Sequence, residues 1–181
     1  TAVLIIIGAI CVFLSEYSNP LTVGDRSVWE KLLFSLFQSV TTRTAGFATA
    51  SIGSFSSAGL LIMIALMIIG ASPGSTGGGI KTSTFFVLAQ GIRSSATNKS
   101  ERAFKYTIPK DSFKKAAVIV LFALSVVFVS TIAVCAIETG LPLSDVLFEM
   151  ASAMGTAGLS TGITPSLSVA SKIITMIVMY I

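Results

Sequence analysis

Residues 116–137 form an apolar run without a single charged side chain. A helix needs about 20 such residues to cross the hydrocarbon core of a bilayer, so this run is long enough for one crossing. Lipid offers the backbone no hydrogen-bond partner, which makes a helix the natural form of such a run. Only 11% of the 181 residues are charged, against roughly 25% in soluble domains, and the mean hydropathy is +0.90. The sequence predicts an all-α membrane protein.

Two shorter segments, 29–41 and 145–153, hold charged or polar residues that a crossing helix would avoid. Both fall short of the roughly 20 residues that a crossing needs, and we expect each to be a re-entrant pore helix. Each precedes a Thr-Ala-Gly sequence, and the glycines of these two sequences, Gly46 and Gly158, are 112 residues apart. The order of span, turn, short helix and Thr-Ala-Gly is the same in both halves. This internal repetition predicts helix, pore-loop, helix units that resemble a potassium-channel-like pore.

We expect two such units joined by a basic connection. The first covers 1–92 and begins with a truncated outer helix; the second covers 116–181, with its outer helix over 116–137 and a truncated inner helix. The connection, 93–115, holds seven basic residues and two acidic ones. Cytosolic loops of membrane proteins are rich in Lys and Arg, so we expect the connection in the cytosol and the pore loops open to the outside. The same basic residues leave open a docking surface for a cytosolic partner.

The segments 42–47 and 154–159 are predicted to form a cation filter. Small side chains and glycine free the backbone to turn its carbonyl oxygens toward an axis, where they replace the water around a cation. We expect a monovalent cation as the transported ligand, with no other metal and no cofactor. The candidate filter residues are Arg43, Thr44, Ala45 and Gly46 in the first segment and Gly155, Thr156, Ala157 and Gly158 in the second.

A glycine-rich segment, 70–82, interrupts the apolar inner helix expected over 58–92. Irregular backbone persists at membrane depth only where protein buries it or where it lines a water-filled path. We interpret the segment as a gate beneath the filter, so that shortening 74–79 should raise the flux. An ordinary cytosolic loop between two short helices is the alternative. The candidate gate residues are Gly70, Pro73, Gly74, Gly77, Gly78, Gly79 and Lys81.

Three charged residues near this path have more than one interpretation. Arg43 would repel cations if it faced the path, so we expect it to point behind the filter and to bond carbonyls or a carboxylate. Glu149 is a candidate for that carboxylate, but also for an outer-mouth charge or a helix-cap carboxylate. Lys81 either bars cations in a closed gate or extends to the cytosolic boundary.

The composition argues against an enzyme. The chain has no histidine, which removes Ser-His and Cys-His nucleophile pairs and the commonest zinc ligand. A membrane enzyme would need a base within reach of Ser75; a non-conducting structural subunit is the other alternative. Cys11 and Cys135 are expected to be reduced thiols in apolar helices. The basic connection has few interleaved aromatic residues, among them Phe104 and Tyr106, so no nucleic acid is expected as a partner.

These motifs resemble the third and fourth pore repeats of the Trk/Ktr/HKT superfamily of potassium transporters, closest to the Ktr membrane subunit. The resemblance rests on 42–47, on 70–82 and on 148–161, and covers essentially the whole chain. In that family, four helix, pore-loop, helix units surround one potassium pathway, and each unit contributes a filter glycine. Gly46 and Gly158 match those glycines, and 70–82 resembles an intramembrane loop that lies under the filter.

The resemblance implies potassium uptake by a multi-pass protein of the cytoplasmic membrane, with sodium dependence, or symport, left open. It also implies several partners: membrane lipid, the first two pore repeats of the same polypeptide, a second copy in a homodimer and a cytosolic ring of nucleotide-binding regulatory subunits. The filter segments lack the Thr-Val-Gly-Tyr-Gly sequence of strict potassium channels, so carbonyls alone do not predict selectivity for potassium over sodium. With half the filter absent, this part of the chain is not expected to conduct by itself.

Overall fold

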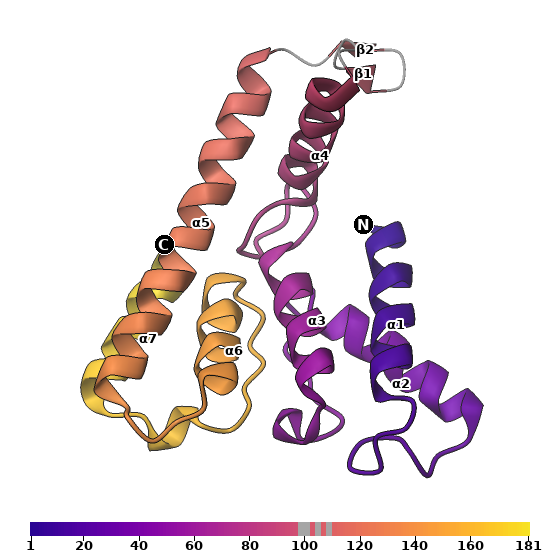
Figure 1. The fold of residues 1–181 in the computed structure, drawn as a ribbon, viewed down its shortest axis with the longest axis vertical. Coiled ribbons are helices and arrows are strands. Elements are labelled where there is room, and N and C mark those ends of the chain that lie inside the picture. The colour runs from indigo at the N-terminus through magenta and orange to yellow at the C-terminus, as the bar shows by residue number, and fades with distance from the viewer. Residues whose placement is uncertain (98–101, 104–105, 108–109) are drawn as a thin grey trace.

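The computed structural model describes residues 1–97, 102–103, 106–107 and 110–181. Within that part of the chain nearly all regular elements are helices (Figure 1), which confirms the predicted all-α fold class. The α-helices are α1 Ala2–Glu16, α2 Val28–Thr41, α3 Ser57–Ile68, α4 Thr82–Thr97, α5 Lys110–Ile137, α6 Leu143–Met154 and α7 Val169–Tyr180. Two 3-10 helices, Ile52–Ser54 and Thr164–Ser166, and a pair of antiparallel two-residue strands, β1 Arg102–Ala103 and β2 Tyr106–Thr107, complete the described elements.

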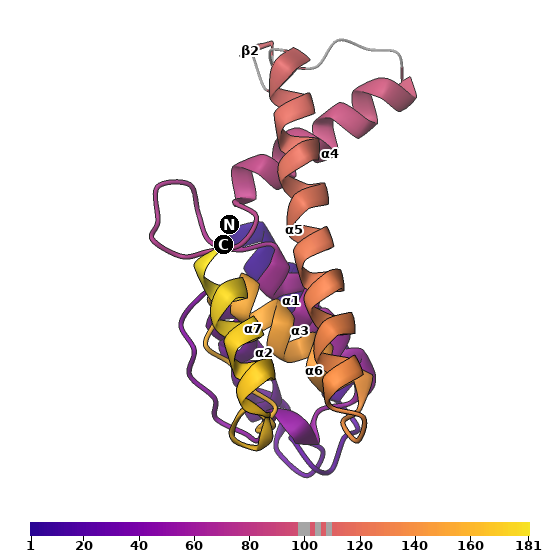
Figure 2. The ribbon, with the colours of Figure 1, turned by 90° about the vertical axis from the view of Figure 1, so that its left-hand side faces the viewer.

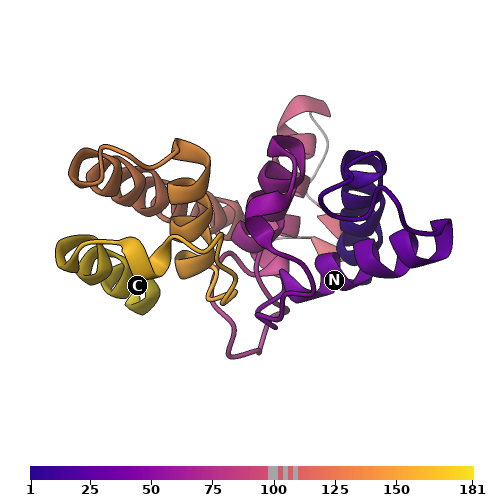
Figure 3. The ribbon, with the colours of Figure 1, turned by 90° about the horizontal axis from the view of Figure 1, so that it is seen from below.

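The helices form two groups that are built alike (Figures 1 and 3). In the first group α1 packs against α2 and α3, and in the second α5 packs against α6 and α7. Each group runs from an outer helix to a short helix and returns through an irregular segment to an inner helix. Contact between α3 and α6 joins the two groups. The short helices α2 and α6 occupy the positions of the two expected pore helices.

Serine side chains begin three of these helices. The Ser27 hydroxyl accepts a hydrogen bond from the Glu30 amide at the start of α2, and the Glu30 carboxylate accepts one from the Ser27 amide. Ser56 and Ser168 cap the inner helices α3 and α7 by accepting from the amide three residues further along. A capping hydroxyl satisfies an amide that no helical carbonyl reaches. The inner helices of both groups therefore start by the same local rule.

The inner helix of the first group is interrupted. α3 ends at Ile68 and α4 begins at Thr82, with no helix between them. The Ile80 amide donates to the Ile68 carbonyl at 3.0 Å, and Ile69 forms a parallel bridge with Ile80, so the two ends of the intervening segment lie side by side. Between these ends the chain forms a projecting loop (Figure 2). We call residues 70–82 the gate loop.

Beyond the gate loop, α4 and the first turns of α5 extend together away from the other helices (Figures 1 and 2). Gly91 of α4 lies against the Phe113 ring of α5, where a Cβ atom would collide with the ring. α5 begins at Lys110, six residues before the expected outer helix, and in the described part of the chain it alone is long and apolar enough to cross a membrane. Lys99 and Lys105 of the predicted basic connection lie outside the described residues.

The main apolar core lies between the two groups. Met63 and Met67 of α3 and Phe148 of α6 are completely buried there. In contrast, α5 exposes large apolar side chains on its outer side, among them Leu121 at 65% and Phe128 at 66%. A helix that is apolar on its exposed side as well as on its packed side suits a lipid surrounding. The core therefore holds α3 and α6 together while the outer helix faces outward.

Candidate functional site

The first filter segment follows the end of α2. The Thr41 hydroxyl donates to the Phe47 carbonyl (2.5 Å) and accepts from the Phe47 amide (2.9 Å), while the Ala45 amide donates to the Thr41 carbonyl (3.2 Å). These bonds fold 42–47 back onto the helix end. Thr44 and Gly46 both have positive φ, 66° and 74°. Positive φ is rare for a β-branched residue such as threonine, so this segment has an unusual and well-defined backbone.

The second filter segment repeats this arrangement after α6. The Ser152 hydroxyl donates to the Leu159 carbonyl (2.6 Å), and the Ala157 amide donates to the Ser152 carbonyl (3.0 Å). Thr156 and Gly158 again have positive φ, 48° and 77°. The two predicted filter segments therefore share sequence and positive φ at equivalent positions, and in each a hydroxyl near the helix end bonds the carbonyl of the last residue of the segment.

The two segments meet at their glycines. A Cβ atom built on Gly158 would lie 3.4 Å from the Gly46 Cα, and one built on Gly46 would lie 3.0 Å from the Ala157 carbonyl oxygen. Positive φ favours glycine at both positions, and at Gly46 the tight contact with the Ala157 carbonyl oxygen also leaves little room for a side chain. Gly155 serves a different contact, since a Cβ atom there would lie 2.6 Å from the Met67 carbonyl of α3. A backbone that glycine frees in this way is suited to present carbonyl oxygens, the type of ligand that can replace the water of a monovalent cation.

The gate loop touches both filter segments. The Gly78 amide donates to the Thr156 hydroxyl at 2.7 Å. A Cβ atom on Gly77 would lie 2.9 Å from the Thr44 hydroxyl oxygen, and one on Gly78 would lie 2.9 Å from that of Thr156. Glycine at both positions is what allows the loop to reach the two threonines. The other candidate gate residues lie to either side: Pro73 and Gly74 are exposed, and Gly70 and Gly79 approach each other at the base of the loop.

Arg43 joins the first filter segment to the base of the gate loop. Its Nη1 donates to the Ile69 carbonyl (2.8 Å) and to the Gly70 carbonyl (3.3 Å). Its Nε and Nη2 are buried without a hydrogen-bond partner among the described residues. The sequence suggests carbonyls or a carboxylate as partners of Arg43, and in the structure its partners are carbonyls. A guanidinium presents a fixed set of donors, so this pairing orients the end of α3 relative to the filter.

Lys81 bonds within its own loop. Its Nζ donates to the Ser75 carbonyl at 3.1 Å and to the Gly77 carbonyl. The side chain is half-buried against its own loop. An ammonium group that bonds two carbonyls braces the loop between Ser75 and Lys81.

Glu149 braces the second filter segment. Its carboxylate, in buried surroundings on α6, accepts hydrogen bonds from the Thr161 amide (3.0 Å), from the Thr164 hydroxyl (3.0 Å) and from the Ser160 hydroxyl. It is therefore neither the partner of Arg43 nor a free outer-mouth charge. Sequence reasoning missed Ser160, Thr161 and Thr164 as its partners. The available signal was an acidic residue in a largely apolar helix, followed by a run of hydroxyl side chains.

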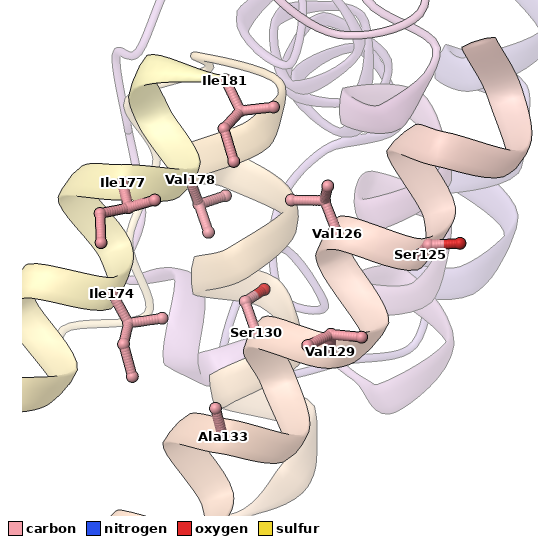
Figure 4. A pocket seen from close by; sticks show the side chains of 9 residues that line it. All are labelled: Ser125, Val126, Val129, Ser130, Ala133, Ile174, Ile177, Val178 and Ile181. Carbon is pink, nitrogen blue, oxygen red and sulfur yellow. The ribbon is translucent and has the colours of Figure 1, made fainter.

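An apolar groove between α5 and α7 carries no ligand for a cation. It has a volume of about 350 Å³, and Figure 4 shows it lined by Val126, Val129, Ile174 and Val178 among others. Its polar side chains are two serines whose hydroxyls donate to carbonyls of their own helix. The part of the chain that the structure describes holds no group of three His, Cys, Asp or Glu side chains able to bind a metal, and both cysteines are free thiols. The filter segments and the gate loop therefore remain the candidate site.

Comparison with known proteins gives matches along the whole chain. The profile of the TrkH family, described as a cation transport protein, matches residues 1–181. The chain is 37% identical over 182 residues to the Ktr system potassium uptake protein B of Bacillus subtilis, with all of this chain and 41% of that protein covered. It is 41% identical over 180 residues to the Ktr system potassium uptake protein D of the same organism, with 98% and 39% covered. The chain thus spans about two fifths of the length of these relatives.

A solved structure has the same fold. The crystal structure of the potassium transporter TrkH from Vibrio parahaemolyticus superposes with a TM-score of 0.71 at 20% sequence identity, over 98% of this chain and 40% of that one. At this identity the likeness concerns the arrangement of helices alone.

Proposed function

Because this chain belongs to the TrkH family of cation transport proteins, we propose that it supplies two pore repeats of a protein that takes up potassium across the cytoplasmic membrane. Residues 1–92 and 116–181 are the two repeats, and 93–115 connects them in the cytosol. Potassium ions shed water at the carbonyls of the two filter segments and of their counterparts in the first two repeats. They then pass the gate loop when it moves aside.

One observation carries this proposal. Gly46 and Gly158 bring two filter segments of the same conformation into contact, and the gate loop lies against a threonine of each. A carbonyl-lined site for a dehydrated cation with a movable obstruction next to it is the minimum that a gated cation path needs. We infer that Thr44 and Thr156 mark the end of the filter that faces the gate loop.

The relatives suggest how the complete protein is assembled. Both Bacillus subtilis proteins are named as parts of a Ktr system, and a relative from Enterococcus hirae, 34% identical, is named a potassium/sodium uptake protein. We propose a homodimer in membrane lipid that rests on a cytosolic ring of nucleotide-binding regulatory subunits, with sodium as a second ligand or a coupled ion. Neither a nucleic acid nor a cofactor has a part in this scheme.

The test is potassium uptake by the full-length parent in cells that lack other potassium uptake systems. Gly46→Ser and Gly158→Ser should each shift the half-saturating potassium concentration, or the preference for potassium over sodium, at normal membrane abundance. Gly140→Ser is the matched control, because Gly140 has ordinary φ and a Cβ atom there meets nothing within 4 Å. Unchanged uptake in both filter variants would mean that the glycines serve helix packing and that the filter assignment is wrong.

The gate is tested separately by shortening the loop. Removal of residues from 74–79 takes away the obstruction and should raise the maximal rate of uptake. An unchanged or lower rate in a folded variant would count against the gate.

Two alternatives make different predictions. A non-conducting structural subunit would show no ion dependence and no effect of the filter substitutions on transport. A membrane enzyme would need an activated Ser75. The Ser75 hydroxyl instead donates to the Ser72 carbonyl at 2.8 Å, and Lys81 bonds the Ser75 carbonyl rather than its hydroxyl. These bonds favour a structural role for Ser75 and a transport role for the chain.

A further inference from the structure

The Thr156 hydroxyl lies where the filter and the gate loop meet, and this position gives it two competing uses. We propose that the gate loop and a dehydrated monovalent cation at the inner end of the filter compete for the Thr156 hydroxyl oxygen, so that the arriving cation itself releases the loop. The inference rests on the proposed function, because it assigns one oxygen of the proposed path to both the ion and the gate. We call the bond from the Gly78 amide to Thr156 the latch.

The latch is a close contact. The Gly78 amide donates to the Thr156 hydroxyl oxygen at 2.7 Å, a short distance for an amide donor. A Cβ atom at residue 78 would lie 2.8 Å from the Thr156 methyl carbon and 3.1 Å from the Met154 carbonyl oxygen, so glycine is needed for the approach. The Thr156 side chain is otherwise exposed and can be reached by an ion.

The competition follows from the chemistry of a hydroxyl. Its oxygen accepts through two lone pairs, and a cation is coordinated by the same electron density that accepts an amide hydrogen. The amide hydrogen carries partial positive charge and repels a cation held on the same oxygen. A cation at Thr156 therefore weakens the latch, and an engaged latch weakens the cation site.

Thr44, the equivalent residue of the first filter segment, lacks a latch. Its hydroxyl donates to the Arg43 carbonyl at 2.6 Å. Gly77 packs against the Thr44 side chain, but no hydrogen bond between the loop and this hydroxyl is found among the described residues. The far part of the loop is thus hydrogen-bonded to Thr156 and only packed against Thr44, while Arg43 of the first filter segment holds the loop at its base. Thr44 is therefore the natural control for the latch.

The remaining loop contacts show what release would break. The base is fixed by the bond from the Ile80 amide to the Ile68 carbonyl and by Arg43 on the Ile69 carbonyl. Lys81 braces the middle of the loop internally. The residues from Pro73 to Thr76 are exposed. Loss of the latch therefore frees the loop from the second filter segment while its base and internal bonds persist.

The latch can be tested by thiol labelling of the loop in the purified full-length parent. Cys11, Cys135 and any further cysteine of the parent are replaced by alanine, and Thr76→Cys provides an exposed reporter on the loop. The rate of modification by a maleimide is measured over a range of potassium concentrations, with choline keeping the ionic strength constant. In this background we expect the rate to rise with potassium, because the cation displaces the loop.

Three substitutions separate the latch from its surroundings. Thr156→Val keeps the shape and removes the acceptor, so labelling without potassium should be roughly 2- to 10-fold faster, the range that one hydrogen bond supplies, and should no longer respond to potassium. Thr156→Ser keeps the hydroxyl and should label like the parent. Thr44→Val should label like the parent in the absence of potassium. If Thr156→Val does not fold, Thr156→Ala removes the same acceptor without a β-branched side chain at positive φ.

The outcomes are decisive. The latch would be disproved if Thr156→Val, or Thr156→Ala in its place, were labelled at the rate of the protein with Thr156 intact. It would also be disproved if Thr44→Val accelerated labelling equally. The proposed competition between cation and loop would be overturned by a different result. In that case the acceptor-free variant labels faster, but the labelling rate of the protein with Thr156 intact does not change with potassium. Because labelling needs no transport, failure of the proposed uptake would appear in the cell assay alone and would not be mistaken for failure of the latch.

Discussion

The Glu16 carboxylate accepts hydrogen bonds from both the amide (3.0 Å) and the hydroxyl (2.5 Å) of Ser56. Glu16 is the last residue of the outer helix α1, and Ser56 caps the inner helix α3. The second group has the same connection, since the carboxylate of Glu138, just after α5, accepts from the amide of Ser168, the cap of α7, at 2.7 Å. A negative charge at a helix N-terminus is favourable. Each repeat therefore ties its outer helix to its inner helix through one carboxylate.

The tie is kept although the chain between its ends differs in length. Ser56 and Ser168 are 112 residues apart, like the filter glycines, whereas Glu16 and Glu138 are 122 residues apart. Most of the difference lies in the connection to the short helix, which is longer before α2 than before α6. A contact that persists across a ten-residue difference belongs to the geometry of the repeat and not to local chain spacing.

We expect Glu16→Gln to destabilise the protein. The Glu16 side chain is completely buried and also accepts from the Asn19 amide group (2.6 Å) and the Thr22 hydroxyl (2.9 Å), so every partner is a donor. The NH₂ group of a glutamine would face these donors and leave some of them without an acceptor, which should lower the free energy of unfolding by roughly 1–3 kcal/mol. The measurement is the thermal unfolding midpoint of the full-length parent in detergent. Glu30→Gln, at an exposed helix cap, is the control, and an equal shift in both variants would contradict the buried tie.

Gly59→Ala should be destabilising for a related reason. A Cβ atom at residue 59 would collide with the Glu16 carboxylate and lie 3.3 Å from the Phe55 ring. Overpacking of this kind costs about 1–3 kcal/mol. Gly140→Ala, in open surroundings, should leave the unfolding midpoint almost unchanged. If the two alanine variants unfold at the same temperature, Glu16 does not occupy the position described.

The second tie should depend on pH. The Ser168 amide, with the Ser168 and Ser171 hydroxyls, lowers the pKa of the Glu138 carboxyl from its ordinary value of 4.5. A carboxyl whose pKa is lower in the folded state contributes stability above its unfolded pKa and loses that contribution as the pH falls through the folded pKa. Glu138→Gln should therefore lower the unfolding midpoint at neutral pH and make progressively less difference below about pH 4.5. A difference that is constant from neutral to acid pH would contradict this account.

The repeat was predictable because its cause is local. Thr-Ala-Gly recurs at 44–46 and 156–158, each time after a short helix, and the glycines between Gly70 and Gly79 disfavour a helix, so chain spacing alone indicates these features. The positive φ of Thr44 and Thr156 was not predictable, because β-branched residues rarely adopt it. The helix bounds follow from caps that are also local, as at Ser27 and Ser56.

The partners of Arg43 and of the gate loop were less predictable because they come from distant segments. Arg43 bonds carbonyls 26 and 27 residues away, and the Gly78 amide bonds a hydroxyl 78 residues away. A sequence pattern shows that Arg43 needs acceptors but not which ones the fold brings near. Lys81 was ambiguous for the opposite reason, since its acceptors are carbonyls of its own irregular loop, which no helical or extended spacing describes.

Glu149→Gln should weaken potassium affinity more than it weakens the fold. The carboxylate holds the Thr161 amide and the Ser160 and Thr164 hydroxyls directly after Gly158, so it fixes the exit of the second filter segment rather than the helix that carries it. Replacement by an amide loses charge-assisted bonds and lets the carbonyls of that segment move, and we expect a roughly 3- to 10-fold rise in the half-saturating potassium concentration, equivalent to about 1 kcal/mol. The matched control is Asp145→Asn, one turn earlier on α6, where the carboxylate accepts from the hydroxyl of the neighbouring Ser144. The measurement is potassium uptake at equal membrane abundance of the variants. If the Glu149 variant has the same half-saturating potassium concentration as the parent, the filter holds its shape without this carboxylate.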